Sequence, residues 1–261
     1  MNMGRRFRSR MLVAGLAVMA FGISLGRASE PVPPQPSRCE VSPDLMPDSG
    51  PFPHARAAMD KDHRLKIVAL GSSSTLGLGA SNSQAAWPAR LQAVLTARLP
   101  GTDVRVVNRG LARQTAVQML DRIDSDVLSE KPSLVIWETG TAEAVRGAAI
   151  DEFTDALLTG VDRLSAAGVD VILMDTQYSR STAEIINFEP YVAAIDQVAA
   201  MRDIDRFPRY AIMRYWVDND RFQFADMSGG VAKKTADQVY DCLGHLLATE
   251  IIEGMSAEQQ N

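Results

Sequence analysis

The stretch from residue 67 to residue 77, IVALGSSSTLG, constrains the fold more than any other part of the chain. It begins as a continuous apolar run, which is typical of a strand buried on both faces of a parallel sheet. It ends in a glycine followed by three serines and a threonine. Ligands and catalytic groups gather at the carboxyl ends of strands in an open α/β sheet. A serine held there by a tight turn is a candidate nucleophile, and a phosphate-cradling loop or a plain serine-rich turn are the alternatives.

Outside this stretch the chain alternates short apolar runs with segments whose apolar residues recur at helical spacing. Apolar runs predict strands at residues 65–70, 104–107, 134–137 and 169–174, with a further short segment at 204–207. Helical spacing, with a proline at the first predicted turn, predicts helices near residues 88–99, 115–128, 153–168, 190–201, 211–217 and 239–251. This alternation predicts an α/β fold in which one parallel sheet is covered by helices on both faces.

Composition limits the class of protein. The 261 residues are 46% hydrophobic, which fits one globular domain. The net charge of −5 gives no excess of positive charge that would indicate nucleic-acid binding. Near the N-terminus, four arginines precede an apolar run at 11–25 that ends in small residues near position 28. This order predicts a signal peptide over residues 1–28, a periplasmic or secreted protein, and no other membrane segment. An uncleaved N-terminal anchor is the alternative.

The rest of the chain is predicted to have three parts. Eight prolines predict that residues 29–60 are an extended arm or linker, followed by the folded domain at 61–255 and a frayed polar tail at 256–261. An oxidising compartment favours a disulfide between Cys39 and Cys242, and two buried thiols are the alternative. Their spacing does not fit a zinc site.

The serine-rich loop does not match the motifs for phosphate or dinucleotide binding. A Walker-type loop ends in Gly-Lys-Ser/Thr, but no lysine lies between Gly71 and Ala89. A dinucleotide-binding loop needs a third glycine where this chain has Asn82. The Gly-x-Ser-x-Gly turn of α/β-hydrolases needs a second glycine where this chain has Thr75. The sequence therefore predicts no cofactor and no metal.

Gly71-Ser72-Ser73-Ser74-Thr75 resembles the Gly-Asp-Ser block of the SGNH (GDSL) hydrolases, with Ser73 at the nucleophile position and Ser72 in place of aspartate. The resemblance is to a bacterial exported subgroup with Gly-Ser-Ser-Ser-Thr at this position. It implies a flavodoxin-like three-layer sandwich with a central parallel sheet, and an esterase or lipase that acts through Ser73. Within residues 66–252, further blocks follow in the family's order at 107–111, 134–141, 174–178, 211–214 and 240–242.

The other catalytic blocks depart from this family's pattern. Serine-based ester hydrolysis needs a base, a group that orients the base, and donors for the developing oxyanion. The second-block glycine, whose N–H is one donor, aligns with Arg113, and the donor asparagine of the third block aligns with Ala142. In the last block, Val231 aligns with the aspartate and Lys234 with the histidine. The resemblance therefore leaves Ser73 without its base, its orienting acid and its side-chain oxyanion donor.

The histidines of the chain offer no replacement for the base. His54 lies in the predicted arm, and His63 precedes the first strand. His245 shares the polar side of the final helix, where we expect it to be exposed. A pair between Ser73 and Lys234 stays open, because Ser–Lys pairs are variants of the triad.

We therefore expect an exported SGNH-hydrolase-like protein with lost or much reduced esterase activity, whose pocket binds a small acyl or carbohydrate ligand. The alternative is an active carboxylic-ester hydrolase in which Ser73 works with a rearranged base such as Lys234. Nucleotide binding through the serine-rich loop has no supporting fingerprint.

Overall fold

A five-stranded parallel sheet forms the centre of the computed structural model, with strand order β2-β1-β3-β4-β5. The structure describes Met1 and residues 37–46, 49–222 and 229–257, with side chains of the last range from residue 232 onward. In this order the carboxyl ends of β1 and β3 lie side by side where the strand order reverses, the usual ligand position of such sheets. The strands are β1 (Arg64–Gly71), β2 (Asp103–Gly110), β3 (Leu134–Glu138), β4 (Asp170–Met174) and β5 (Asp205–Phe207).

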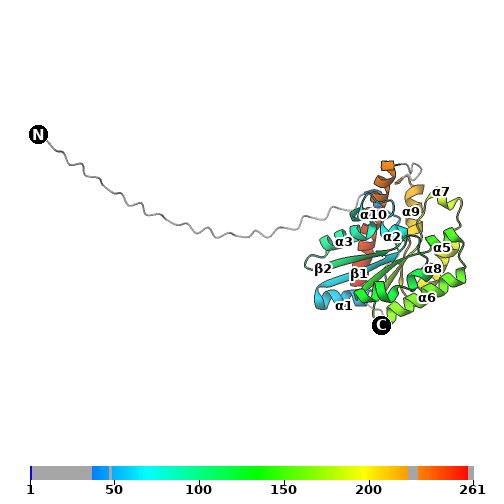
Figure 1. The fold of residues 1–261 in the computed structure, drawn as a ribbon, viewed down its shortest axis with the longest axis horizontal. Coiled ribbons are helices and arrows are strands. Elements are labelled where there is room, and N and C mark those ends of the chain that lie inside the picture. The colour runs from blue at the N-terminus through cyan, green and yellow to red at the C-terminus, as the bar shows by residue number, and fades with distance from the viewer. Residues whose placement is uncertain (2–36, 47–48, 223–228, 258–261) are drawn as a thin grey trace. The chain divides into compact units, whose positions relative to one another are not determined.

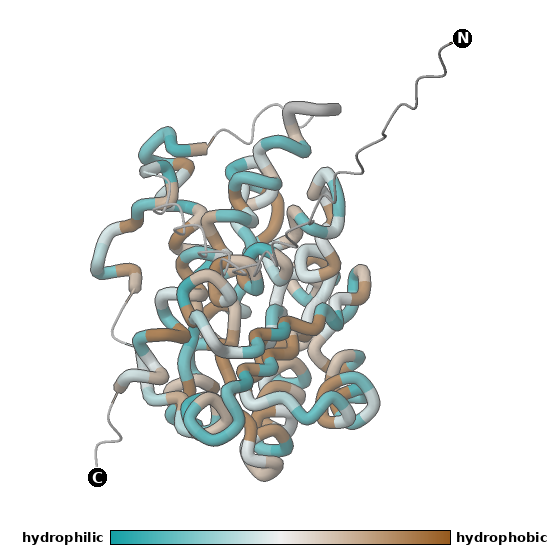
Figure 2. The backbone as a smooth tube through the Cα atoms, turned by 90° about the vertical axis from the view of Figure 1, so that its left-hand side faces the viewer, coloured by the Kyte–Doolittle hydropathy of each residue, from teal (hydrophilic) through white to brown (hydrophobic). Residues whose placement is uncertain are grey.

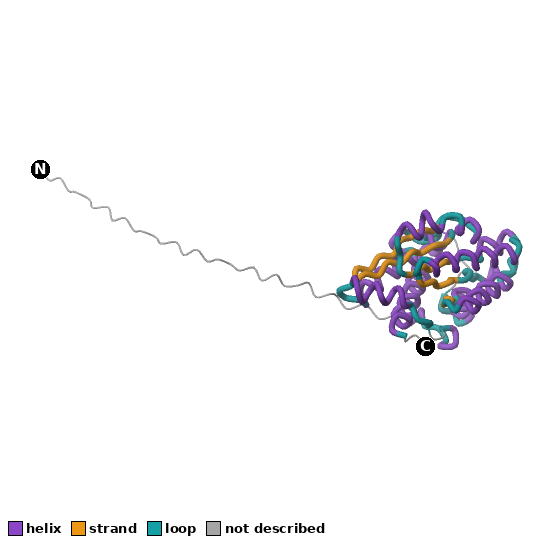
Figure 3. Tube along the Cα trace, turned by 90° about the horizontal axis from the view of Figure 1, so that it is seen from below, coloured by secondary structure: helices purple, strands orange, loops and turns teal. Residues whose placement is uncertain are grey.

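The central strands are buried on both faces because successive side chains point to opposite sides. In β1, Ile67 and Ala69 join one hydrophobic core, whereas Val68 and Leu70 join the other. The most apolar parts of the chain lie in the middle of the view in Figure 2, and Figure 3 shows the strands as one layer among the helices. The folded domain is therefore a three-layer sandwich with a central parallel sheet, as predicted.

Four helices cover the face toward which Ile67 points. Two of them, α3 and α10, approach each other closely, because a Cβ on Gly244 of α10 would lie 2.9 Å from the backbone nitrogen of Leu91 in α3. Figure 1 labels these four helices near the strands of the sheet. The four helices are α1 (Pro53–Asp62), α3 (Trp87–Arg98), α9 (Arg209–Asp218) and α10 (Gly229–Ser256).

The other face is covered by α4 (Ala116–Leu120), α6 (Ile150–Ala166) and α8 (Glu189–Arg202). The predicted apolar stripe of α6 is buried against the sheet. The predicted helix at 115–128 is interrupted, because a π-helical turn at Ile123–Val127 follows α4. Hydrophobic spacing alone does not detect this change of pitch.

The segment before β1 is folded where the sequence predicts an extended linker. It contains short 3-10 turns and the helix α1, whose first turn accommodates Pro53. Cys39 is fully buried and forms a disulfide with Cys242 of α10. The Phe52 N–H donates to the Gly254 carbonyl at 3.0 Å. The folded domain therefore begins well before the predicted boundary at residue 61.

His245 is buried in α10, which corrects the prediction that it is exposed. The polar side of α10 faces α3, where Asp241 pairs with Arg90 and Thr249 accepts from Arg98 Nη1 at 2.8 Å. Burial lowers the pKa of His245. A polar helix face covered by a second polar face has the same sequence pattern as one exposed to solvent.

No helix among the described residues is long and apolar enough to cross a membrane. The predicted signal peptide lies outside the described residues after Met1, as do residues 29–36 of the predicted arm and 258–261 of the predicted tail.

Candidate functional site

Ser73 follows the carboxyl end of β1 and is the first residue of the short helix α2 (Ser73–Leu76). Two glycines at strand ends let α2 approach the sheet. A Cβ on Gly71 would lie 2.1 Å from Thr75 Oγ1, and one on Gly110 would lie 2.2 Å from a backbone nitrogen of α2. Real Cβ contacts are not this short, so glycine is required at both strand ends.

Glu138, the last residue of β3, fixes the loop that carries Ser73. Its Oε2 accepts hydrogen bonds from the Ser72 N–H at 2.9 Å and from Thr75 Oγ1 at 3.0 Å. The side chain is fully buried. A buried carboxylate is stable only with hydrogen-bond or charge partners, so Glu138 and its donors hold each other in place.

Arg209, the first residue of α9, supplies the opposite charge. Its Nη1 lies 3.8 Å from Glu138 Oε1 and donates to Ser74 Oγ at 2.6 Å. Its Nη2 donates to Gln177 Oε1 at 3.4 Å. Both charged side chains are only 1% exposed. This network joins the end of β3 to the chain segments that follow β1, β4 and β5.

Arg113, in the loop after β2, contacts Ser73 through its backbone. The Arg113 N–H donates to Ser73 Oγ at 3.0 Å. The φ angle of Arg113 is 63°, a left-handed value that is uncommon for residues other than glycine. This conformation is consistent with the glycine that the related hydrolases are expected to have here. Arg146, at the end of α5 (Thr141–Arg146), donates from Nη2 to the Arg113 carbonyl at 2.6 Å.

A cavity of about 310 Å³ opens beside Ser73. The structure brings Ser73, Arg113 and Ala142 together in its lining. The lining combines hydroxyl groups, guanidinium groups and apolar side chains. Its other residues are Ser72, Ser74, Leu78, Glu138, Thr141, Val145, Arg146 and Gln177.

The structure does not bring Lys234 to this cavity. Lys234 is exposed on α10 and lines a separate hollow with Ser81, Arg90 and Asp237. None of the hydrogen bonds among the described side chains joins Lys234 to Ser73. Val231 belongs to the first turn of α10, and its side chain lies outside the described part of the structure.

All three histidines of the chain are described, and none lies in the lining of the Ser73 cavity. His63 precedes β1 and Ser73 follows it, so the eight residues of the strand separate them by roughly 25 Å. His54 lines a cavity at the opposite end of the sheet. His245 is buried in α10. The chain therefore has no imidazole base at Ser73.

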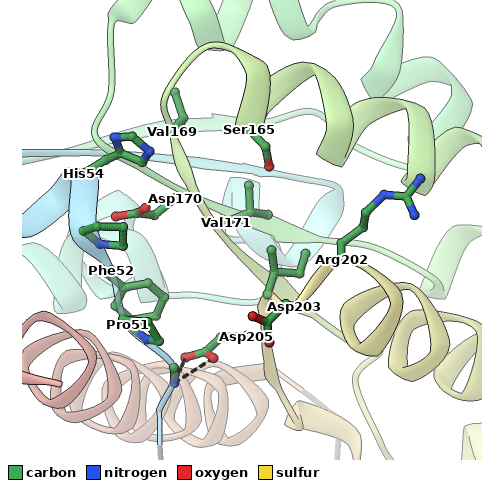
Figure 4. Close-up of a pocket in the computed structure, with 13 residues that line it drawn as sticks. Pro51, Phe52, His54, Ser165, Val169, Asp170, Val171, Arg202, Asp203 and Asp205 are labelled. Atoms are coloured by element: carbon green, nitrogen blue, oxygen red, sulfur yellow. Dashed lines mark hydrogen bonds between the residues drawn. The ribbon is translucent and has the colours of Figure 1, made fainter. Parts of the chain in front are cut away.

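That opposite cavity, of about 290 Å³, lies at the amino ends of β4 and β5 (Figure 4). Asp170 Oδ2 accepts from the Ala55 N–H at 2.8 Å, and the Asp205 carboxylate accepts from the Gly50 N–H at 2.8 and 3.1 Å. Burial raises the pKa of Asp170 to about 6. Because both carboxylates bind the backbone before and within α1, we assign them a structural role.

Glu143 is a further buried acid near the site. Its carboxylate accepts hydrogen bonds from the Gly140 N–H at 3.1 Å and from the Ala116 N–H. Burial raises its pKa. Glu143 is absent from the lining of the Ser73 cavity, and its hydrogen bonds join the start of α5 to the start of α4.

Sequence reasoning misses Glu138, Arg209 and Arg146. Glu138 does leave a signal, because a single charged residue ends an otherwise apolar strand run. Arg209 leaves none, since its partner lies on a distant strand. Arg146 looks like an ordinary basic residue in the last turn of a helix.

The 2-1-3-4-5 order of the parallel sheet defines a flavodoxin-like α/β protein, with a serine at the carboxyl end of its first strand, where such folds bind ligands. The model of the non-GDSL lipase-like family matches residues 38–257, and the chain belongs to that family. The family resemblance of the sequence motifs is thereby confirmed.

Esterase TesA of Pseudomonas aeruginosa is 32% identical over 111 residues, which are 42% of this chain and 54% of the esterase. The chain thus spans about half the length of this curated relative. A lipase/acylhydrolase from Enterococcus faecalis has a TM-score of 0.59 at 23% identity, covering 76% of this chain and 99% of that chain. A two-domain esterase active on acetylated mannans has a TM-score of 0.62 at 15% identity, covering 82% of this chain and 56% of that chain. At these identities the solved structures show the fold alone.

Proposed function

We propose that this chain is an SGNH-hydrolase-like protein that has lost most or all of its esterase activity and uses the cavity at Ser73 to bind a small ligand. One observation carries the proposal. Among the described residues, the only hydrogen-bond partner of Ser73 Oγ is the Arg113 N–H, which is a donor. A serine hydroxyl becomes nucleophilic when a base accepts its proton, and no base is hydrogen-bonded to this one.

The losses of rate expected from the missing catalytic groups support this proposal. Removal of the base from a serine triad lowers kcat by about a million-fold. Loss of one oxyanion donor costs about a hundred- to a thousand-fold, and Ala142 offers no side-chain donor. The two losses do not add, yet either alone lowers turnover to a small residual rate.

The contacts that hold the Ser73 loop in place do not depend on a catalytic base. Arg113 aligns with the glycine that supplies one oxyanion donor in the family, and its N–H donates to Ser73 Oγ through the backbone rather than through the side chain. Glu138 and Arg209 hold the serine loop through contacts that use no catalytic histidine. The cavity can therefore persist as a binding site after the base is lost.

The named relatives support an acyl or carbohydrate ligand. One is an esterase, one a lipase/acylhydrolase and one an esterase active on acetylated mannans. We further propose that the protein is exported to the periplasm or secreted. The disulfide between Cys39 and Cys242 supports an oxidising compartment, in line with the predicted signal peptide.

The alternative, an active esterase with Lys234 as base, receives no support from the geometry. Lys234 is exposed in a hollow whose lining contains none of the residues around Ser73. A lysine base must be largely neutral, which requires burial or a neighbouring cation. Lys233 is such a neighbour, but Lys234 is exposed and is absent from the lining of the Ser73 cavity. We therefore favour the inactive protein.

The proposal predicts that the purified protein hydrolyses p-nitrophenyl acetate and butyrate no faster than its Ser73→Ala variant. Ser83→Ala, an exposed serine outside the cavity, is the matched control. A fluorophosphonate probe should label the wild-type protein no more than Ser73→Ala. Turnover that disappears in Ser73→Ala and persists in Ser83→Ala would overturn the proposal, and its further loss in Lys234→Ala would establish the Ser–Lys alternative.

A further inference from the structure

We infer that a small cavity lined by residues of β5 and α10 binds a partly hydrated divalent cation, Mg²⁺ or Ca²⁺, through the carboxyl groups of Asp205 and Glu250. This cavity has a volume of about 210 Å³ and shares no lining residue with the cavity at Ser73. The inference is therefore independent of the proposed function. It follows from an unpartnered buried carboxyl group, from the charges around it and from the size of the cavity.

Glu250 is a buried carboxyl group without a partner. Its side chain lines the cavity, and the residue is only 5% exposed. Its Oε2 atom is buried without a hydrogen-bond partner, and Glu250 belongs to no ion pair among the described residues. Burial raises the pKa of Glu250, and the nearby charge of Asp205 raises it further. A buried carboxylate is costly unless a positive charge compensates it, and a cation in the cavity supplies that charge.

The rest of the lining leaves the cavity with a negative charge. The Asp205 carboxylate accepts from the Gly50 N–H at 2.8 and 3.1 Å and keeps further acceptor capacity. Arg206 is the only cationic residue of the lining, but its guanidinium already pairs with Asp175 and Asp196. The two carboxyl groups that line the cavity therefore have no ion-pair partner in the described part of the chain.

The kind and number of the ligands indicate which cation fits. Carboxylate oxygens suit hard divalent cations such as Mg²⁺ and Ca²⁺, and neither histidine nor cysteine lines the cavity. The described residues contain no group of three or more His, Cys, Asp or Glu side chains arranged to hold a metal ion. A cation held by two carboxyl groups must therefore keep part of its water shell, as Mg²⁺ commonly does. The cavity has room for several waters, since each takes roughly 30 Å³ in the liquid.

A cation at this place joins separate parts of the fold. Asp205 belongs to the edge strand β5 and also holds the backbone of Gly50 before α1, whereas Glu250 belongs to the final helix α10. The two carboxyl groups meet only in the folded protein, so a cation that binds both stabilises the folded state. No motif of the sequence indicates this site, because its ligands lie far apart along the chain.

Isothermal titration calorimetry of the EDTA-treated wild-type protein with MgCl₂ and with CaCl₂ tests this inference. At constant ionic strength, we expect at least one of the two cations to bind saturably at one site, with a dissociation constant of about 1 mM or below. The same cation should raise the midpoint of thermal unfolding, whereas an equal ionic strength of NaCl should not. Binding of only one of the two cations supports the inference and identifies the ion.

Glu250→Gln is the main variant, because it keeps the size of the side chain and removes its charge. It should weaken cation binding about tenfold or more, since the charge of the ligands sets the affinity of such sites. Asp205→Asn, which keeps an acceptor for the Gly50 N–H, should weaken binding in the same direction. Glu184→Gln is the matched control, because it removes one exposed carboxylate outside the cavity and should leave the dissociation constant unchanged.

Two results would overturn the inference. One is the absence of saturable binding of either cation to the wild-type protein, a result that does not depend on the folding of any variant. The other is a Glu250→Gln variant that binds the cation as tightly as Glu184→Gln does, which would place the bound ion elsewhere on the protein.

Discussion

Glu138 and Arg209 form a buried ion pair next to the loop that carries Ser73. Each has partners besides the other, since Glu138 accepts from the Ser72 N–H and Arg209 donates to Ser74 Oγ. Burying two charges costs solvation, which such pairs recover only through good geometry and further hydrogen bonds. The pair therefore adds little net stability but holds the serine loop in one geometry. Removal of one partner leaves the other charge buried and uncompensated.

Glu138→Gln should lower the free energy of unfolding by about 3–5 kcal/mol, because the guanidinium of Arg209 remains buried without its counter-charge. Urea denaturation of the variant and the wild-type protein measures this difference. Glu184→Gln, an exposed glutamate in the described part of the chain with no ion pair there, should change the value by less than about 0.5 kcal/mol.

The double variant Glu138→Gln/Arg209→Gln provides a second check on the same pair. Its loss of stability should be smaller than the sum of the two single losses, because removing both charges leaves neither uncompensated. A Glu138→Gln variant as stable as Glu184→Gln would show that the pair does not hold the loop.

At the scale of elements, the segment before β1 is joined to the end of the chain. The disulfide links Cys39 to Cys242 of α10, at a sequence separation of 203 residues. The Phe52 N–H donates to the Gly254 carbonyl near the C-terminal end of α10. The segment thus contacts α10 at two places, so it is part of the folded domain rather than a tether.

Cys39→Ser/Cys242→Ser should lower the free energy of unfolding by about 5 kcal/mol. The disulfide closes a long loop in the unfolded chain and lowers the entropy of that state, and this effect grows with the length of the loop. Guanidinium denaturation of oxidised wild-type protein and of the variant measures the loss. Wild-type protein treated with dithiothreitol should match the variant. Equal stability of the oxidised and reduced proteins would contradict this entropic account.

At the scale of the whole molecule, buried carboxyl groups couple stability to pH. Burial raises the pKa of Asp175, which follows β4, to about 7. It also raises the pKa of Glu250 in α10 well above its usual value. Above its unfolded-state pKa near 4, each group holds its proton more tightly in the folded protein than in the unfolded chain. Stability is therefore lost as pH rises from the unfolded-state pKa to the folded-state pKa, and it levels off above the folded-state pKa.

The free energy of unfolding should fall between about pH 5 and pH 7, with Asp175 contributing up to about 1.4 kcal/mol per pH unit, and the fall should level off above pH 7. His245, whose pKa is lowered by burial, opposes this trend near its ordinary pKa, because the unfolded chain binds its proton more tightly than the folded protein does. Asp175→Asn should flatten the slope, because asparagine keeps an acceptor for the Tyr210 N–H but does not titrate.

Thermal and urea unfolding at several pH values measure this slope. Asp162→Asn is the control, because its partner Arg202 lowers the pKa of Asp162 and moves its titration below this pH range. An equally steep slope in Asp175→Asn would show that other groups cause the dependence.

The sequence by itself determined the sheet and the place of Ser73. Continuous apolar runs predict strands buried on both faces, and the amphipathic segments between them predict the covering helices. Ser73 at the end of β1 follows from adjacent residues, as do the aligned positions of Arg113 and Ala142 in the cavity lining. These features depend on local periodicity or on motifs a few residues long, which a single sequence records.

Only the tertiary structure decided which distant residues meet. The ion pair of Glu138 with Arg209 joins β3 to α9, and the contact of Arg146 with Arg113 joins α5 to the loop after β2. The burial of His245 depends on α3 covering a polar helix face. Lys234 aligns with a catalytic histidine, yet its exposed place on α10 separates it from the cavity. Such contacts form between elements after they pack, so no spacing along the chain records them.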